Sequence, residues 1–284
     1  MTIEPYMLAI LAMVAAPIVG ALLSGLDRKV TARIQGRIGP PIIQPFYDVL
    51  KLLGKEPLAV NRVQIFYAYM HLAFMLAVVA MLVLGQDMLL ILFVHAFGTI
   101  SLIVGGMCVR SPYSRIGAQR KIMQMVAYEP ILVLLVMGIY LVNGRSFLCG
   151  SVPSHPALLL SLPLVFVAFL MAVAIKLHKS PFDVSTSHHA HQELVKGVTL
   201  EYAGPYLAII EIADFCEVAI LFGVMAAFWA SVPWVGLLLA AAGFFAEIIL
   251  DNSFARLTTM WMVKHMWAIP TVLALGNVIW LYYR

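Results

Sequence analysis

Residues 176–217 read KLHKSPFDVSTSHHAHQELVKGVTLEYAGPYLAIIEIADFCE and interrupt a chain that is almost uniformly apolar on either side. This stretch holds half of the eight histidines and six of the fourteen acidic residues. We interpret it as a polar loop over residues 176–204, followed by a helix that carries carboxylates into a membrane. The rest of the chain is expected to form the membrane body that holds this loop.

The composition argues against a soluble fold. Of 284 residues, 63% are hydrophobic and 11% are charged, and the mean hydropathy is +0.96. Soluble domains carry about 25% charged residues. The net charge of +4 does not indicate a nucleic-acid partner, because membrane proteins collect Lys and Arg in their cytoplasmic loops. We therefore expect contacts with membrane lipids and none with nucleic acid.

The cysteines predict no metal centre in this chain. Cys108, Cys149 and Cys216 lie far apart and form no CxxC pair, so the spacing of an iron–sulfur or zinc site is absent from the sequence. The first apolar segment begins near Ile3 without a basic n-region or a small-residue cleavage site. We interpret it as a retained span rather than a signal peptide.

The apolar segments predict an all-α integral membrane protein with about eight transmembrane helices in a single domain, residues 1–284. A span needs roughly 20 apolar residues. Residues 42–56 are too short to span but amphipathic, which favours an interfacial helix in the first cytoplasmic loop over a packed linker. The predicted spans cover residues 4–24, 63–85, 88–109, 122–143, 157–175, 205–229, 235–250 and 262–283.

The basic residues predict the orientation. Sixteen of the eighteen Lys and Arg residues lie in or beside the connections after the first, third, fifth and seventh spans, and the other two are Arg145 and Arg284. This alternation matches the positive-inside rule. It predicts a multi-pass protein of the cell (inner) membrane, with loop 176–204 in the cytoplasm and both termini on the opposite side.

Carboxylates within spans are candidate ion-path residues, because an acidic side chain at that depth costs roughly 2.5–3.5 kcal/mol on insertion scales. Glu129 is one, unless it pairs with an arginine for packing. Glu211, Asp214 and Glu217 recur every three residues, which indicates one helix face and either a proton relay or a solvated helix end.

Other polar groups leave alternatives open. Glu247 and Asp251 share a helix face and either join the ion path or, for Asp251, cap the helix or pair with Arg256. The loop histidines could bind metal, buffer protons, contact a partner or form polar surface; they are His188, His189 and His191. No HExxH pattern or cysteine partner supports metal. Within spans, His71 and His95 are expected to hydrogen-bond across helices rather than bind a metal or haem.

Four basic residues follow the first span and set topology or contact anionic lipids; they could also dock a peripheral partner. They are Arg28, Lys29, Arg33 and Arg37.

Several motifs, in order, resemble the family of the respiratory complex I membrane subunit known by the letter H, together with its hydrogenase relatives. They are DRKVTARIQGRIGP, QPFYDVLKLLGKE, AQRKIMQMVAYEP, SPFDV, QELVKG, LEYAG and IADF, between Asp27 and Phe215. Where the respiratory form has an acidic run after PFD, this chain has a histidine-rich segment, which puts a quinone headgroup site in doubt. SHHAHQELVKG is most similar to the integral membrane subunit of Ech-type energy-converting nickel–iron hydrogenases.

The resemblance implies a membrane subunit of an oxidoreductase complex with no cofactor of its own. The nickel–iron centre and 4Fe–4S clusters are expected in partners: hydrogenase large and small subunits and a ferredoxin-like iron–sulfur subunit. An antiporter-like membrane subunit would accept protons or sodium. Glu129, Glu193, Glu201 and Asp214 fall on the family's acidic positions, and Asp183 falls on its PFD aspartate, in the coupling loop. Glu211 and Glu217 rest on spacing alone.

Three alternatives remain. The chain could be the quinone-chamber subunit of a complex I-type NADH:quinone oxidoreductase. It could be a structural scaffold whose carboxylates pair locally. A stand-alone secondary transporter is the third, although no inverted repeat is evident in the sequence.

Overall fold

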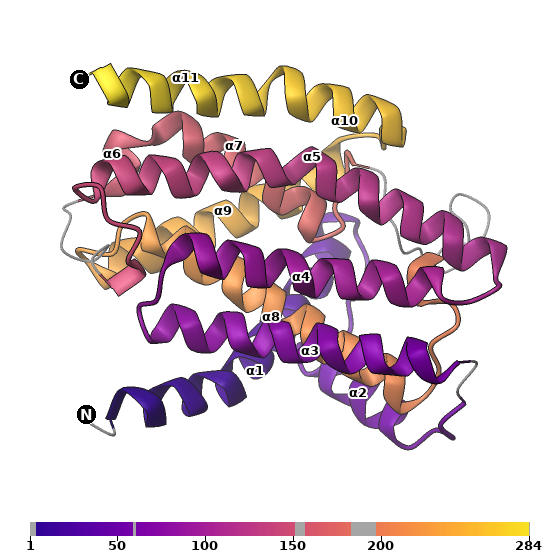
Figure 1. Ribbon diagram of the computed structural model, residues 1–284. Helices are drawn as coiled ribbons and strands as arrows, with labels where there is room; N and C mark the ends of the chain where they lie inside the picture. Colours follow the sequence, from indigo (N-terminus) through magenta and orange to yellow (C-terminus); the bar gives the residue numbers. More distant parts are fainter. Residues whose placement is uncertain (1–3, 59–60, 151–156, 183–196, 284) are drawn as a thin grey trace. The chain divides into compact units, whose positions relative to one another are not determined.

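The computed structural model describes residues 4–58, 61–150, 157–182 and 197–283, which are helical almost throughout and contain no strand (Figure 1). The α-helices are α1 (Glu4–Ile34), α2 (Gln44–Leu53), α3 (Arg62–Val83), α4 (Met88–Met107), α5 (Pro112–Val142), α6 (Leu158–Ser161), α7 (Pro163–Lys176), α8 (Pro205–Ala227), α9 (Pro233–Ser253), α10 (Thr259–Ala268) and α11 (Pro270–Tyr283). A 3₁₀ turn, η2 (Gly197–Thr199), precedes α8.

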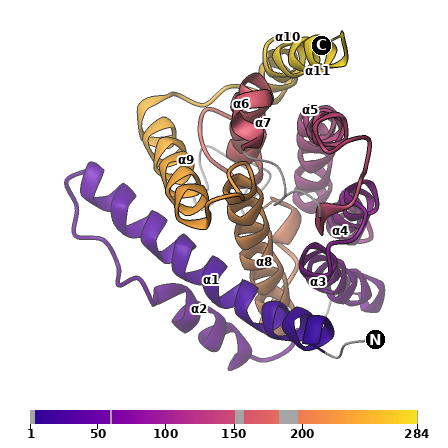
Figure 2. The ribbon, with the colours of Figure 1, turned by 90° about the vertical axis from the view of Figure 1, so that its left-hand side faces the viewer.

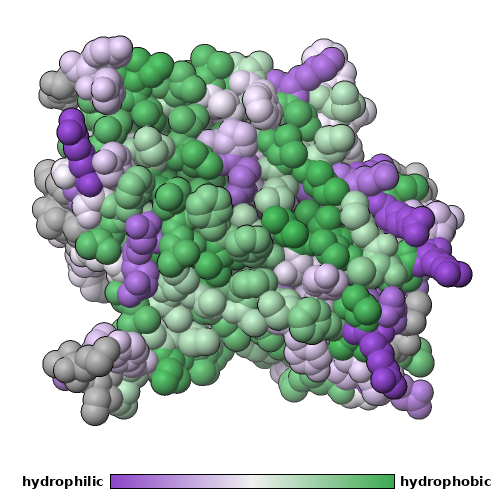
Figure 3. Space-filling view, in the orientation of Figure 1, coloured by the Kyte–Doolittle hydropathy of each residue, from purple (hydrophilic) through white to green (hydrophobic). Residues whose placement is uncertain are grey.

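The predicted all-α integral membrane fold is confirmed. Six described helices are long and apolar enough to cross a membrane: α1, α3, α4, α5, α9 and the segment Thr259–Tyr283. Helix α8 is also long and apolar, with 23 residues, but it carries three carboxylates: Glu211, Asp214 and Glu217. Large hydrophobic side chains cover much of the surface (Figure 3), as expected for a chain whose solvent is lipid.

The chain divides into two compact units. Unit 1 comprises residues 1–80, 94–122 and 184–220, and unit 2 comprises residues 81–93, 123–183 and 221–284. Helices α3, α4, α5 and α8 contribute residues to both units. The predicted organisation as one membrane domain stays a prediction.

In unit 1, α2 lies beside α1, as both ribbon views show (Figures 1 and 2). Arg28 of α1 donates a hydrogen bond to Asp48 of α2 at 2.8 Å. Phe46 and Val49 are half-buried, whereas Leu50 and Leu53 are exposed. Helix α1 runs to Ile34, through the basic segment predicted as a loop, because Lys and Arg are good helix formers and Arg33 suits a helix C-terminus.

Unit 2 has a hydrophobic core built from α5, α7, α8 and α9–α11, with Phe169, Phe182 and Phe228 among its fully buried residues. Helix α11 packs along α7, and Asn277 joins them. The Asn277 Oδ1 accepts from the amides of Leu164 and Val165, which have no partner within α7 because they begin it. The Asn277 Nδ2 donates to the Ser161 carbonyl.

Prolines divide two of the predicted spans. The segment predicted over residues 157–175 consists of α6 and α7, which begins at Pro163. The last span consists of α10 and α11, which begins at Pro270. Proline lacks the amide hydrogen that would continue the ladder, and it disfavours helical backbone in the residue before it.

Candidate functional site

Helix α8 supplies three carboxylates to unit 1. A step of three residues rises about 4.5 Å and turns by about 60° in the reverse sense, so successive carboxylates face different neighbours. Glu217 is buried, whereas the Asp214 side chain is 36% exposed. Glu211 is partly buried and has contacts of its own.

Two of these carboxylates meet histidines of neighbouring helices in unit 1. His95 Nε2 of α4 lies 3.3 Å from Glu217 Oε1. His71 Nε2 of α3 lies 3.8 Å from Asp214 Oδ1, and its Nδ1 lies 2.8 Å from the Gly98 carbonyl oxygen of α4. The expectation that both histidines hydrogen-bond across helices is therefore confirmed.

Glu201 lies at the end of the polar loop, and close packing in unit 1 positions this end. A methyl group on Gly117 of α5 would meet the Val198 amide nitrogen at 2.2 Å, and one on Gly105 of α4 would meet the Tyr202 hydroxyl at the same distance. A larger side chain than that of glycine would clash with these atoms, so both positions favour glycine. Burial raises the pKa of Tyr202, whose hydroxyl lies 3.4 Å from the Gln64 carbonyl oxygen.

Glu201 lines a cavity of about 620 Å³ in unit 1. The other lining residues are Asn61, Cys108, Val109, Arg110, Ser111, Pro112 and Tyr113. The Asn61 side chain donates to the Cys108 carbonyl at 3.3 Å, which ties the start of α3 to the end of α4. Glu201 thus lies at an open cavity lined by both polar and apolar residues, in contrast to the buried Glu217.

Glu129 lies in unit 2, just before Pro130 inside α5. Its Oε2 is buried and has no hydrogen-bond partner among the described residues. The positive charge of Lys176 acts on this carboxylate. Lys176 is itself only 5% exposed, and its Nζ lies 4.2 Å from the ring centre of Tyr128.

Whereas Glu129 is half-buried, a second carboxylate of unit 2, Glu247 of α9, is fully buried. Neither of its oxygens has a hydrogen-bond partner in the described parts of the chain. The positive charge of Lys179 favours the ionised form of this carboxylate, whereas the negative charge of Asp251 opposes it. Asp251 Oδ1 accepts from the Ser180 amide at 2.8 Å, so it caps the turn after α7. The positive charge of one buried lysine therefore acts on each of these glutamates: Lys176 on Glu129 and Lys179 on Glu247.

The basic residues proposed for docking lie on α1 and just beyond it. Arg28, Arg33 and Arg37 are exposed, and Lys29 is half-buried. Arg28 already binds Asp48 within the chain, which leaves Arg33 and Arg37 as the more available cations.

Five predicted residues lie outside the described residues: Asp183, His188, His189, His191 and Glu193. Among the described residues, no group of three or more His, Cys, Asp or Glu side chains could hold a metal ion.

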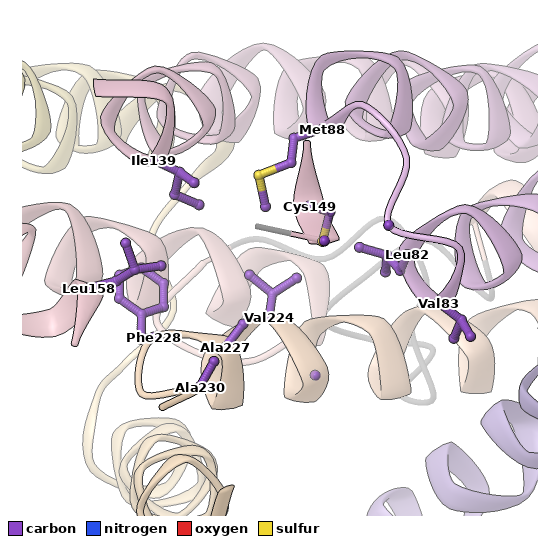
Figure 4. A pocket seen from close by; sticks show the side chains of 13 residues that line it. Leu82, Val83, Met88, Ile139, Cys149, Leu158, Val224, Ala227, Phe228 and Ala230 are labelled. Carbon is purple, nitrogen blue, oxygen red and sulfur yellow. The ribbon is translucent and has the colours of Figure 1, made fainter. Parts of the chain in front are cut away.

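Unit 2 also contains an apolar cavity of about 380 Å³ (Figure 4). Its described lining residues include no charged side chain, so they offer nothing to an ion. They are Leu82, Val83, Gly85, Met88, Ile139, Cys149, Gly150, Leu158, Gly223, Val224, Ala227, Phe228 and Ala230.

Sequence reasoning missed the burial of Lys176 and Lys179, which were assigned to the exposed loop. The structure extends α7 to Lys176 and buries both lysines. Lys179 lies beyond the end of α7, so helical spacing could not have indicated this burial. No local sequence pattern indicated which residues His71 and His95 contact.

The chain is similar to known proteins over most of its length. The family model described as NADH dehydrogenase matches residues 7–282. The H subunit of NADH-quinone oxidoreductase from Bacillus cereus is 30% identical, over 89% of this chain and 85% of that protein. A putative NADH-ubiquinone oxidoreductase of Methanocaldococcus jannaschii is 34% identical, over 69% of this chain and 68% of that protein.

A solved structure shares the fold. A chain of the membrane-bound sulfane sulfur reductase, an archaeal respiratory membrane complex, matches with a TM-score of 0.86 and 24% identity. The match covers 98% of this chain and 99% of that one. Because the family model matches nearly the whole chain and the relatives are similar over most of theirs, the chain belongs to the NADH dehydrogenase family, among proteins similar to the H subunit.

Proposed function

We propose that this chain is the membrane-anchoring and ion-coupling subunit of an energy-converting nickel–iron hydrogenase. In such a complex, ferredoxin oxidation and hydrogen formation on docked soluble subunits would drive proton or sodium translocation. The family match supports an H-type membrane subunit of a respiratory complex. The hydrogenase branch rests on SHHAHQELVKG, which resembles Ech-type subunits.

One observation carries the coupling role: α8 presents Asp214 and Glu217 to histidines of α3 and α4 within unit 1. Carboxylates placed against imidazoles inside spans can hold and pass protons, whereas a tether requires no such groups. The Asp214 side chain is partly exposed, which would let these carboxylate–histidine pairs exchange protons with their surroundings. Glu201, at its open cavity, would connect the loop to these pairs.

Energy would pass in steps. Electron transfer in a docked subunit changes charge near loop 176–204, and Glu201 responds first. The carboxylates of α8 then bind or release protons, which move toward an antiporter-like subunit. Such coupling requires two states with different proton affinities.

The proposal is tested with Asp214→Asn in the purified complex, reconstituted in vesicles. Hydrogen production and ion uptake are measured together. We expect ion uptake per hydrogen molecule to fall at least tenfold, while hydrogen production continues when an ionophore removes the gradient. Asp87→Asn is the matched control, because Asp87 caps the start of α4 through the Leu89 amide and asparagine caps equally well. Full coupling in an assembled Asp214→Asn complex would contradict the proposal.

A quinone-chamber subunit is the second candidate, favoured by the relatives named as H subunits of NADH-quinone oxidoreductase, which match 89% of this chain. It predicts quinone reduction by the purified complex and inhibition by quinone-site ligands. A scaffold role predicts that neutral substitutions impair assembly without changing the ion yield of the complexes that do assemble.

A further inference from the structure

Helix α7 ends in a turn that directs the start of the polar loop. The Lys179 amide donates to the Ala174 carbonyl at 2.9 Å, and the His178 amide donates to the Ile175 carbonyl at 3.1 Å. His178 has a φ angle of 55°, in the left-handed region in which helices commonly end. A residue with a side chain adopts this region at a cost that glycine avoids, and it persists where the surrounding structure holds it. Contacts outside the turn are therefore expected to hold this conformation.

The backbone after this turn is hydrogen-bonded to α9 and to the connection that follows α9, all within unit 2. The Ser180 amide donates to Asp251 Oδ1 of α9 at 2.8 Å. The Pro181 carbonyl accepts from the Leu257 amide, between α9 and α10, at 2.6 Å. Because the donor and the acceptor lie on neighbouring residues, these two bonds fix both the position and the direction of the chain.

The side chains on either side of these two residues are buried and interact with the same part of unit 2. Phe182 is 1% exposed, and its ring centre lies 6.3 Å from that of His265 on α10. Lys179 is 3% exposed, and its positive charge acts on the fully buried Glu247 of α9. Four successive residues of the chain, from Lys179 to Phe182, thus interact with four residues of α9, α10 and their connection. We call these four the α9–α10 anchor: Glu247, Asp251, Leu257 and His265.

Stability alone does not explain the buried charges of this anchor. Moving a lysine and a carboxylate out of water costs free energy, and their mutual attraction often does no more than offset that cost. Apolar side chains of similar volume commonly pack in such a place equally well or better. An apolar contact can slide, however, whereas removal of either charge leaves the other buried without compensation. The charges of Lys179 and Glu247 therefore favour one placement of the chain over its neighbours.

We propose that the α9–α10 anchor positions the start of loop 176–204, and that Lys179 and Glu247 are its positioning residues. This rests on the proposed coupling function, in which Glu201 responds at the other end of the same loop. That end is packed in unit 1, where Gly117 lies against the backbone of Val198. A loop that is fixed at both ends passes a displacement on, whereas a loop with a loose start absorbs it. Coupling through this loop therefore requires the anchor.

The anchor is tested by amide hydrogen exchange of residues 177–182 in the whole assembled complex. The variants are Lys179→Met, Glu247→Gln and the double variant, which has neither charge. We expect exchange in each single variant to rise at least tenfold, because a buried charge has lost an opposite charge. Exchange in the double variant should lie closer to that of the wild type than exchange in either single variant. Lys264→Met is the matched control, because it makes the same substitution at an exposed lysine of unit 2.

A measurement of coupling separates positioning of the loop from packing alone. In sealed vesicles, we expect ion uptake per hydrogen molecule to fall at least fivefold in Lys179→Met, while hydrogen production continues when an ionophore removes the gradient. Lys179→Arg keeps the positive charge and should restore both the ion yield and the slow exchange of residues 177–182. The control variant Lys264→Met should match the wild type in both measurements.

Wild-type exchange in both single variants would overturn the inference and leave the coupling function intact. A double variant whose exchange rate rises by the product of the two single effects would overturn the pairing of the two charges. Faster exchange with a full ion yield would overturn the positioning role. A wild-type complex that moves no ion would overturn the proposed coupling function, and the exchange measurements would still decide whether the anchor exists.

Where a charge variant does not assemble, Asp251→Ala and Asp251→Asn decide. Asparagine keeps an oxygen that can accept from the Ser180 amide, and alanine has none. The anchor requires exchange of the Ser180 amide to rise at least tenfold in the alanine variant and to stay near the wild-type rate in the asparagine variant. Equal exchange in these two variants would contradict the proposal.

Discussion

The Trp267 side chain supplies a hydrogen bond that Pro130 removes from helix α5. Pro130 has no amide hydrogen, so the Val126 carbonyl, four residues earlier in α5, loses its partner in the helix. The Trp267 indole of α10 donates to this carbonyl at 3.1 Å. In lipid, an unsatisfied carbonyl cannot turn to water, so the contact is worth more than its exposed position suggests.

We expect Trp267→Phe to destabilise the protein by about 1–3 kcal/mol, the usual cost of leaving a desolvated polar group without a partner. The thermal unfolding midpoint in detergent measures this. Trp234→Phe is the matched control, because Trp234 is 76% exposed on α9. Equal midpoints for the two variants would show that the indole contact does not hold α10 to α5.

Local sequence patterns predicted the all-α membrane fold but not the partners of individual side chains. Apolar segments and basic connections located the helices because membrane thickness and charge act on each segment separately. His95 and Glu217 are 122 positions apart, and no local spacing brings them together. The burial of Lys176 and Lys179 likewise depends on helices far away in the chain, so the sequence placed them in solvent.

Among the elements, α2 is joined to α1 by a charged hydrogen bond, from Arg28 to Asp48. Burial of Asp48 favours its neutral form, but hydrogen bonds from Arg28 and Gln44 outweigh burial and lower the pKa of this carboxyl. A group with a lowered pKa stabilises the folded state above its unfolded pKa of about 3.9, and this stabilisation disappears as the pH falls through the folded value.

Asp48→Asn should therefore loosen α2 at pH 7 and have no effect in strong acid. The expected loss is below about 1 kcal/mol, because the pair is partly exposed and screened. Amide hydrogen exchange of residues 44–53, compared between variant and wild type at each pH, measures it. Glu56→Gln, in the exposed segment after α2, is the control. A difference that persists unchanged at low pH would contradict the role of this charge.

Close packing of α1 on α8 in unit 1 depends on Gly20. A methyl group there would lie 1.8 Å from the Phe215 carbonyl oxygen, which is backbone and cannot rotate away. Gly20→Ala should cost at least the upper part of the range of about 1–3 kcal/mol seen for overpacking. Gly276→Ala is the control, because nothing lies within 4 Å of the added methyl. Thermal midpoints that fall equally in both variants would argue against this contact.

For the molecule as a whole, the predicted orientation can be tested with its own cysteines. Cys108 directly follows α4, on the predicted cytoplasmic side, and Cys149 follows α5, on the predicted opposite side. Both are partly exposed, whereas Cys216 is buried in α8 and serves as an internal negative control. The thiolate is the reactive form, and burial raises the pKa of Cys149, so labelling should be carried out near pH 9.

We expect a charged, impermeant methanethiosulfonate to label Cys149 in right-side-out vesicles and Cys108 in inverted ones. Cys149→Ala and Cys108→Ala assign each signal. Because labelling needs thiolate, the Cys149 signal should weaken as the pH falls from 9 to 7. A reversed pattern would place the termini in the cytoplasm. It would also place loop 176–204 and Glu201 on the side of the membrane where no ferredoxin-dependent partner could dock. The proposed ion route from that loop to Asp214 would then be wrong.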